Sequence, residues 1–258
     1  MKHCLENCKE MTLIRARASQ LISSAQKASE FWIEPDAFLR YLPVIKHLHA
    51  LKPFPKILEV GSGDFGLSTY LRYQLVKVDL AFSHPPQPRR PNVSADASKL
   101  PFPNGVFDLV FSVDLLEHIP PNKRETVVSE MLRVSRKEVL AIFPAGAKSN
   151  KQDLVIAEEF QKRTRRELGI LKTHQLFPFS EEKDVTTWLR KMRGQIKKWK
   201  ISNSFNLALR KILITGWLKR SSWAINSARA AFQYPFLAEI LNFGNCYRRI
   251  LQIEKKRF

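Results

Sequence analysis

The sequence predicts an α/β fold built on a mostly parallel sheet with helices on both faces. Apolar runs typical of buried parallel strands alternate with stretches of helical periodicity between residues 56 and 143. A cluster of glycines directly follows the first of these runs. Hydrophobic residues make up 44% of the 258-residue chain, which is sufficient for a substantial core.

The first half of the chain alternates between helices and strands. We expect helices over residues 11–51 and a buried strand at 56–60, because Pro53 and Pro55 break the helical pattern just before the apolar run. The proline-rich stretch 85–91 predicts a loop, and the strand near 93–95 is only weakly defined. The other expected elements are a helix at 67–73, a strand at 75–79, a strand at 107–113, a helix at 123–133 and a strand at 138–143.

The second half changes to basic, aromatic-rich segments with helical periodicity. We expect helices at about 150–170, 181–194 and 205–242, and strands at 196–201 and 247–254. These boundaries suggest a helical N-terminal cap (1–52), a core (53–145) and a C-terminal part (146–258) that completes the sheet and carries helical insertions.

Cysteine usage and hydropathy indicate the compartment. Cys4, Cys8 and Cys246 match neither a disulfide framework nor the paired short spacings of a zinc site, so we expect a reducing environment and no metal. We find no signal-peptide pattern and no apolar run of the roughly 20 residues that span a bilayer. A cytoplasmic protein, soluble or peripheral to the membrane, is therefore expected.

The net charge of +19 is concentrated in the C-terminal half. Residues 136–258 contain 26 of the 43 basic side chains but 10 of the 24 acidic ones. Such an excess of positive charge favours an anionic partner, which could be nucleic acid, an anionic membrane or a phosphorylated substrate. A solvated basic face that only aids solubility is the alternative.

A glycine-rich turn lies between the first strand and its helix. Gly61, Gly63 and Gly66 follow Glu59 at the spacing G-x-G-x-x-G, where a tight turn lets the backbone approach a ligand. Asp79 ends the next strand, where an acidic side chain can accept hydrogen bonds from ribose hydroxyls. A nicotinamide oxidoreductase shares this pattern, but the short connection from Gly66 to Asp79 favours a smaller nucleoside ligand.

Four motifs occur in order along the chain: the glycine turn, Asp79, the segment 95–102 around Asp96, and the run 107–119 that ends in Glu117, His118 and Ile119. Together they resemble the motifs of class I S-adenosylmethionine (SAM)-dependent methyltransferases, and most closely those of the type 11 methyltransferase domain. The resemblance covers about residues 53–145. It implies a Rossmann-like sheet with an antiparallel last strand, and it departs from the family in the proline-rich loop 83–94, where a helix is usual.

The resemblance also implies roles for individual residues. The glycine loop would lie under the methionine moiety, Glu59 would orient nearby polar groups, and Asp79 would hold the ribose. Asp96 and Ala97 would flank the adenine, and Ser112 and Val113 would line the mouth where the methyl group is transferred. The residues expected to bind SAM are Glu59, Gly61, Ser62, Gly63, Gly66, Asp79, Leu80, Asp96, Ala97, Ser112 and Val113.

The expected reaction is direct displacement at a sulfonium methyl group, for which alignment of the reactants matters most. A general base is needed only if the acceptor must lose a proton, as a hydroxyl would. His118 is the nearest candidate, although it could instead pack or cap a helix. Asp114 and Glu117 are interpreted as structural or cofactor-loop residues.

The acceptor cannot be identified from the sequence. The segment 159–179, with His174, lies where the family inserts acceptor-recognition elements, and we expect a small-molecule, glycan or lipid-linked acceptor methylated at oxygen. Residues 205–243 combine aromatic and basic side chains, which could form a packed helical lid, a membrane-interface helix or a nucleic-acid contact. An RNA methyltransferase and a non-catalytic SAM-binding module therefore remain as alternatives, and the oligomeric state stays open.

Overall fold

The computed structural model describes residues 39–51, 55–64, 66–69, 75–83, 91–165, 176–219 and 241–256. Most of the expected N-terminal cap, the proline-rich loop 84–90, His174 and residues 220–240 lie outside this part. The described elements are α3 (Leu42–Ala50), β1 (Ile57–Val60), η1 (Leu67–Thr69), β2 (Leu75–Asp79), β3 (Asn92–Ser94), β4 (Phe107–Val113), η2 (Leu116–His118), α4 (Pro121–Val134), β5 (Ser135–Pro144), α5 (Gly146–Thr164), α7 (Glu182–Lys191), β6 (Ile196–Asn206), α8 (Leu207–Leu218) and β7 (Cys246–Lys255).

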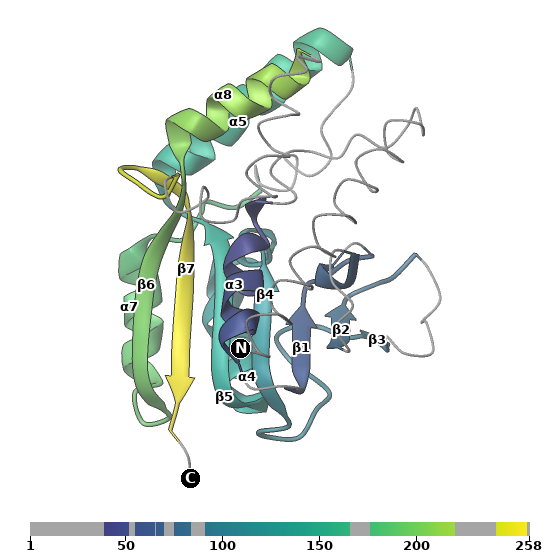
Figure 1. The fold of residues 1–258 in the computed structure, drawn as a ribbon, viewed down its shortest axis with the longest axis vertical. Helices are drawn as coiled ribbons and strands as arrows, with labels where there is room; N and C mark the ends of the chain where they lie inside the picture. Colours follow the sequence, from purple (N-terminus) through teal and green to yellow (C-terminus); the bar gives the residue numbers. More distant parts are fainter. Residues whose placement is uncertain are drawn as a thin grey trace, which may run out of the picture.

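The strands form one sheet in the order β3-β2-β1-β4-β5-β7-β6 (Figure 1). Neighbours from β3 to β5 pair in parallel, whereas β7 runs antiparallel to both β5 and β6. The predicted parallel sheet with an antiparallel last strand is thus confirmed. The strand order reverses between β1 and β4, and open α/β sheets bind ligands beyond the carboxyl ends of the strands at such a point.

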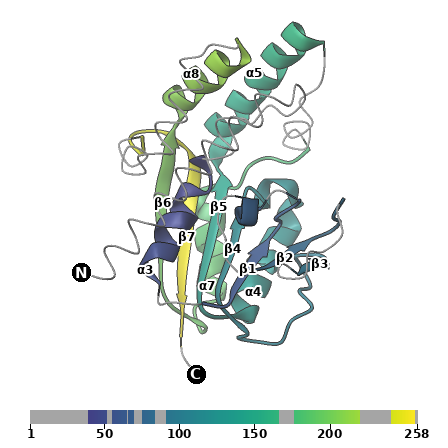
Figure 2. The ribbon, with the colours of Figure 1, turned by 45° about the vertical axis from the view of Figure 1, so that its right-hand side comes forward.

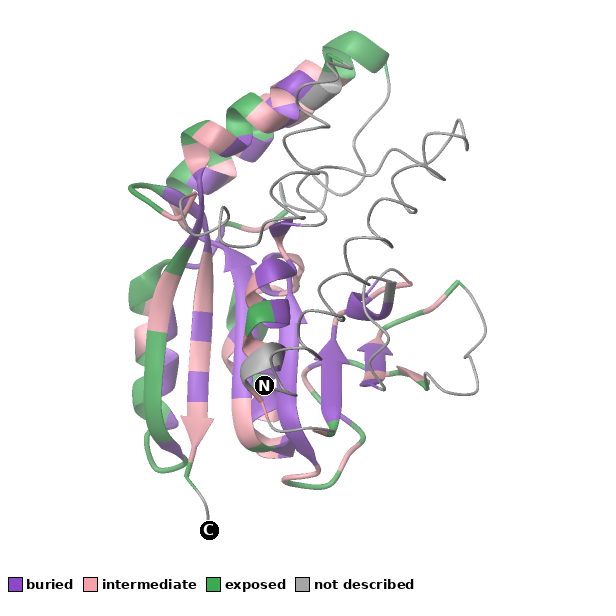
Figure 3. Ribbon diagram, viewed as in Figure 1, coloured by how far each residue is buried: buried purple, intermediate pink, exposed green. Residues whose placement is uncertain are grey.

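Helices cover both faces of the sheet, as predicted. Val127, Val128, Met131 and Leu132 of α4 and Leu189 of α7 are buried in a core on one face. A second core on the other face joins α3 to the sheet. The central strands β1 and β4 are buried along their whole length (Figure 3), which explains why their sequences are nearly continuous apolar runs.

Helices α5 and α8 lie side by side and extend away from the carboxyl ends of the strands (Figure 2). Ile156 of α5 and Ile214 of α8 form a small apolar cluster between them. Arg210 and Asp153 form a buried ion pair at 2.9 Å, and the Tyr247 hydroxyl donates to the same carboxylate at 2.5 Å. Within the described residues, no helix combines the length and hydropathy needed to cross a bilayer.

The junction between β6 and α8 differs from the prediction. β6 continues to Asn206, beyond the expected end at residue 201, and the helix expected from 205 begins at Leu207. The side chain of Asn206 accepts hydrogen bonds from the backbone N–H groups of Ala208 (2.9 Å) and Leu209 (3.1 Å). Asn206 therefore acts as the N-cap, because its side chain satisfies amide groups that the first turn leaves without partners.

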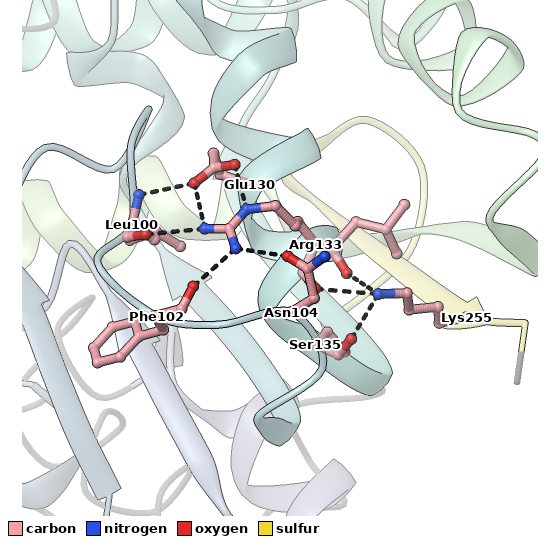
Figure 4. A network of polar contacts seen from close by, with 8 residues as sticks. Leu100, Phe102, Asn104, Glu130, Arg133, Ser135 and Lys255 are labelled. Atoms are coloured by element: carbon pink, nitrogen blue, oxygen red, sulfur yellow. Dashed lines mark hydrogen bonds and ion pairs between the residues drawn. The ribbon is translucent and has the colours of Figure 1, made fainter. Parts of the chain in front are cut away.

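A polar clamp holds the segment 100–104 against α4 (Figure 4). Arg133 donates to the carbonyl oxygens of Leu100 (2.9 Å) and Phe102 (2.8 Å) and pairs with Glu130 at 2.6 Å. The Lys255 ammonium donates to carbonyl oxygens at the end of α4, where cations interact favourably with the helix dipole. The clamp fixes the chain that follows Asp96 and Ala97.

Candidate active site

The glycine turn and Asp79 lie side by side at the carboxyl ends of β1 and β2. The backbone N–H of Gly63 donates to the Asp79 carboxylate at 2.7 Å, and the N–H of Leu80 donates to its other oxygen at 2.8 Å. Each carboxylate oxygen has a further lone pair, so Asp79 keeps the capacity to accept two hydroxyl hydrogen bonds. The residues predicted to hold the methionine moiety and the ribose thus share one site.

Two glycines in this turn have backbone conformations that disfavour other residues. Gly61 has φ of +74° and Gly63 has φ of +52°. A Cβ at Gly61 would lie 2.6 Å from Leu115 Cδ1, whereas a Cβ at Gly63 would meet nothing within 4 Å. Gly61 is therefore packed against the loop that follows β4, and Gly63 faces open space in which a ligand can approach the backbone.

Glu59 lies under the turn and is 1% exposed. Its carboxylate accepts hydrogen bonds from the Tyr41 hydroxyl at 2.9 Å and from the backbone N–H of Leu67 at 3.1 and 2.9 Å. A Cβ at Gly66 would lie 2.5 Å from this carboxylate, which explains the third glycine. Burial raises the pKa of Glu59 to about 7, despite the opposing effects of these hydrogen bonds and of Lys77 and Arg40.

The segment after β2 forms another wall of the site. The backbone N–H of Ser83 donates to Asp64 at 3.1 Å, which connects this segment to the glycine turn. The Lys77 ammonium donates to the carbonyl oxygen of Asp64 and lies 5.5 Å from the centre of the Phe82 ring. Leu80 is 72% exposed, so it offers apolar surface beside Asp79.

Asp96 and Ala97 lie next to the end of β2. The N–H of Ala95 donates to the carbonyl oxygen of Asp79 at 2.9 Å, which brings the two predicted acidic residues close in space. One carboxylate oxygen of Asp96 accepts from the N–H and hydroxyl of Ser98, and these bonds lower the pKa of Asp96. Its other oxygen has no hydrogen bond to the described residues.

Ser112 and Val113 end β4, which lies next to β1. Both are buried, and the Ser112 hydroxyl has no hydrogen-bond partner among the described residues. His118 is partly buried in η2, three residues after Leu115. The predicted roles of these three residues at the methyl-transfer mouth remain predictions.

Several residues at this site have no obvious signal in the sequence. Tyr41, Lys77 and Leu115 contact the glycine turn or its support, but tyrosine, lysine and leucine are common in any chain. Glu117 is also buried, and its pKa is raised well above the usual range by burial and by the nearby Asp114 carboxylate. Among the described residues, no cluster of His, Cys, Asp or Glu has the geometry to hold a metal ion.

Comparisons with known proteins agree with this geometry. Residues 58–143 match the profile of a family described as a methyltransferase domain, and no curated protein matches the chain. Phosphoethanolamine N-methyltransferase 2 of Haemonchus contortus, solved with S-adenosyl-L-methionine, superposes with a TM-score of 0.55 at 16% identity, covering 88% of this chain and 55% of that one. The 1,6-didemethyltoxoflavin-N1-methyltransferase of Burkholderia thailandensis gives 0.48 at 14% identity, covering 94% and 88%.

At 16% identity the superposition on the Haemonchus contortus enzyme shows a shared fold. The family match adds the domain type, and the matched segment contains Glu59, the glycine turn, Asp79 and Asp96. The site has a backbone that a ligand can approach, a carboxylate placed for hydroxyl groups and a neighbouring apolar surface, which fit an adenosyl group. Residues 58–143 of this chain are therefore similar to a methyltransferase domain, and the site that they form fits S-adenosylmethionine.

Proposed function

We propose that this enzyme transfers the methyl group of SAM to an oxygen of a small-molecule, glycan or lipid-linked acceptor. One observation carries the cofactor part of the proposal. The Asp79 carboxylate is bonded to the backbone of Gly63, next to the exposed Leu80 and next to the strand end that leads to Asp96. A carboxylate that can accept hydrogen bonds from hydroxyl groups, a backbone that a ligand can approach and an apolar surface thus occur together where the strand order of the sheet reverses.

Bound SAM supplies an electrophilic methyl group on a sulfonium centre. Asp79 would accept hydrogen bonds from the ribose hydroxyls through the lone pairs that Gly63 and Leu80 leave available. Asp96 would accept a hydrogen bond from the adenine amino group through the oxygen that Ser98 does not use. Glu59 lies under the turn, where it accepts hydrogen bonds from Tyr41 and Leu67 and would keep the turn in place around the ligand.

The methyl-transfer end of the site contains a candidate general base. His118 comes three residues after Leu115, whose side chain packs against Gly61, so His118 lies on a segment that contacts the cofactor turn. For a hydroxyl acceptor, His118 would take the proton as oxygen attacks. His118→Asn should then lower kcat about a hundredfold or more while leaving the Kd for S-adenosylhomocysteine unchanged. An unchanged kcat would assign His118 to packing.

The acceptor class is tested by following the methyl group. The purified protein is incubated with SAM labelled in its methyl group and, separately, with neutral glycosides, a lipid extract and total RNA. We expect label in glycosides or lipids and none in RNA. Label in RNA alone would contradict the proposal, and binding of S-adenosylhomocysteine without transfer to any pool would favour a non-catalytic module.

An RNA methyltransferase is the second candidate because of the positive charge of the C-terminal half. Lys197 and Lys200 of β6, Lys211 of α8 and Lys219 in the turn after α8 are exposed, although Lys197 pairs with Glu254 at 2.6 Å. If RNA binds these side chains, the affinity must fall steeply as salt rises, because counterions are released from the phosphates. RNA binding that is undetectable or independent of salt would remove this candidate.

We propose a cytoplasmic location with peripheral contact to an anionic membrane, because the exposed lysines of β6 and α8 would approach anionic headgroups. Flotation with vesicles of anionic and of neutral lipid tests the contact, and equal recovery with both would contradict it.

We also keep the division into a cap (1–52), a cofactor-binding core (53–145) and a C-terminal part (146–258) as a proposal. Limited proteolysis that cuts first near residues 52 and 145 would support it.

A further inference from the structure

A groove lies between α3 and the antiparallel edge of the sheet, and we call it the α3 groove. Its volume is about 460 Å³, within the range typical of pockets for small molecules. Leu140 of β5, Ile250 and Gln252 of β7, and Ser202 of β6 lie along its floor. None of the residues predicted to bind SAM lines this groove, so the cofactor site does not account for it.

The floor of the groove carries neutral polar side chains. Ser202, Ser204 and Gln252 line it, and within the described residues none of their side chains makes a hydrogen bond. Hydroxyl and amide groups can both donate and accept. A ligand rich in hydroxyl groups could satisfy them, whereas a purely apolar occupant would leave them without partners at a cost in free energy.

The walls of the groove are apolar. Leu39, Leu42 and Pro43 of the α3 segment line it, together with Phe205 and Leu241. The ionisable lining residues are Lys46, which is exposed, and His47, whose ring contacts Glu138. Such a lining provides no buried cation for a strongly anionic ligand, and it combines apolar surface with neutral hydrogen-bonding groups, as the ring of a sugar requires.

The groove is connected to the end of β4, where methyl transfer is expected. Val113 pairs with Ile142 of β5, which pairs with Ile250 on the groove floor. Two strand spacings separate Val113 from Ile250, or about 10 Å. Just before α3, Leu39 in the groove wall precedes Arg40, whose guanidinium lies 3.6 Å from Asp114, the residue after β4.

We propose that the α3 groove is an acceptor subsite that binds an uncharged sugar ring, at a distance from the atom that is methylated. This inference rests on the proposed function, because the sugar is taken to be part of the methyl acceptor. Binding energy from a remote part of a substrate can be used to align the reacting atoms. The groove thus favours a glycoside among the acceptor classes considered above.

The test uses p-nitrophenyl β-D-glucopyranoside, which joins a sugar to an apolar ring, in saturation-transfer NMR with the full-length protein. Ser202→Leu and Gln252→Leu remove neutral polar groups of the floor. Gln195→Leu is the matched control, because Gln195 is exposed in the turn before β6 and does not line the groove. Thermal unfolding and S-adenosylhomocysteine titration of each variant report on folding and on the cofactor site.

We expect the glucoside to bind the wild type and the Gln195→Leu control equally, and its Kd to rise at least about fivefold in each groove variant. The Kd for S-adenosylhomocysteine should stay unchanged in all of them. The proposal is overturned if the glucoside does not bind, if the groove variants bind it as well as the wild type does, or if p-nitrophenyl phosphate binds as well as the glucoside. Wild-type protein that binds the glucoside but not S-adenosylhomocysteine would refute the proposed function and leave the sugar subsite standing.

Discussion

Arg248 on β7 forms a two-point ion pair with Asp114, the residue that follows β4. The distances are 2.7 Å from Nε to Oδ1 and 2.6 Å from Nη2 to Oδ2, and the Arg248 side chain is 3% exposed. Asp114 has φ of +51°, and the next residue, Leu115, packs against Gly61. The last strand of the sheet therefore fixes the loop that supports the cofactor turn.

Replacement of Arg248 by methionine should lower the free energy of unfolding by about 3 kcal/mol or more, because the Asp114 charge would be left without its main partner in a nearly buried place. Urea unfolding measures the loss. The double variant Arg248→Met with Asp114→Asn should be less destabilised than Arg248→Met alone. If the single and the double variant lost the same free energy of unfolding, the unpaired charge of Asp114 would not be the cause of the destabilisation.

Glu59 should make stability depend on pH. Its pKa is raised to about 7 in the folded protein, so between the unfolded value near 4.5 and 7 the folded state holds a proton that the unfolded state has released. The stabilisation is complete below pH 4.5 and is lost as pH rises through 7, by up to about 3 kcal/mol. Glu59→Gln should remove this dependence, which urea unfolding of both proteins from pH 4.5 to 8 would reveal. If the free energy of unfolding changed with pH in the same way in both proteins, Glu59 would not be the group responsible.

Alanine at Gly63 should weaken cofactor binding by adding a Cβ where a ligand approaches the backbone. Gly105 is the matched control, because its φ is +66° and a Cβ there also meets nothing within 4 Å, but it lies in the turn before β4. Both variants should lose about 1–2 kcal/mol of stability to backbone strain. In calorimetric titration, a weaker affinity for S-adenosylhomocysteine is expected for Gly63→Ala only. A comparable loss of affinity for S-adenosylhomocysteine in both variants would mean that backbone strain, and not the added Cβ at the site, weakens binding.

The clamp around Arg133 should contribute to stability and not to chemistry. Arg133→Met removes hydrogen bonds to Leu100 and Phe102 and the pair with Glu130, and we expect a loss of about 1–3 kcal/mol. Arg193→Met, at an exposed turn position, should change stability little. Differential scanning calorimetry of the variants tests this. A stable Arg133→Met protein would show that the segment 100–104 is held by other contacts.

The sequence predicted the parallel part of the sheet well because β1, β4 and β5 from residue 139 onward are buried on both faces. Most of their residues are therefore apolar, and such runs are easy to recognise. The glycine turn and Asp79 were also predicted together, and the bond from Gly63 to Asp79 confirms that they are neighbours. Here local sequence spacing and topology suffice to bring the residues together.

The antiparallel edge was predicted less well because long-range polar contacts decide its burial. The strand predicted at 247–254 has polar residues at its ends, which favours exposure there, but Tyr247 and Arg248 are 1% and 3% exposed. They are buried because Asp153 and Asp114, distant in sequence, satisfy their polar groups. The second half of β6 was missed for a similar reason, since Ser202 and Ser204 give it no continuous apolar signal.

The most direct test of the account is calorimetric titration of S-adenosylhomocysteine into the wild type, Asp79→Ala and the exposed control Glu158→Ala. We predict saturable binding to the wild type and the control, with affinity weakened by about 1–3 kcal/mol in Asp79→Ala because the ribose hydroxyls lose their acceptor. A folded wild-type protein that does not bind, or an Asp79→Ala variant that binds as tightly as the wild type, would contradict the claim that the glycine turn and Asp79 hold the methyl donor.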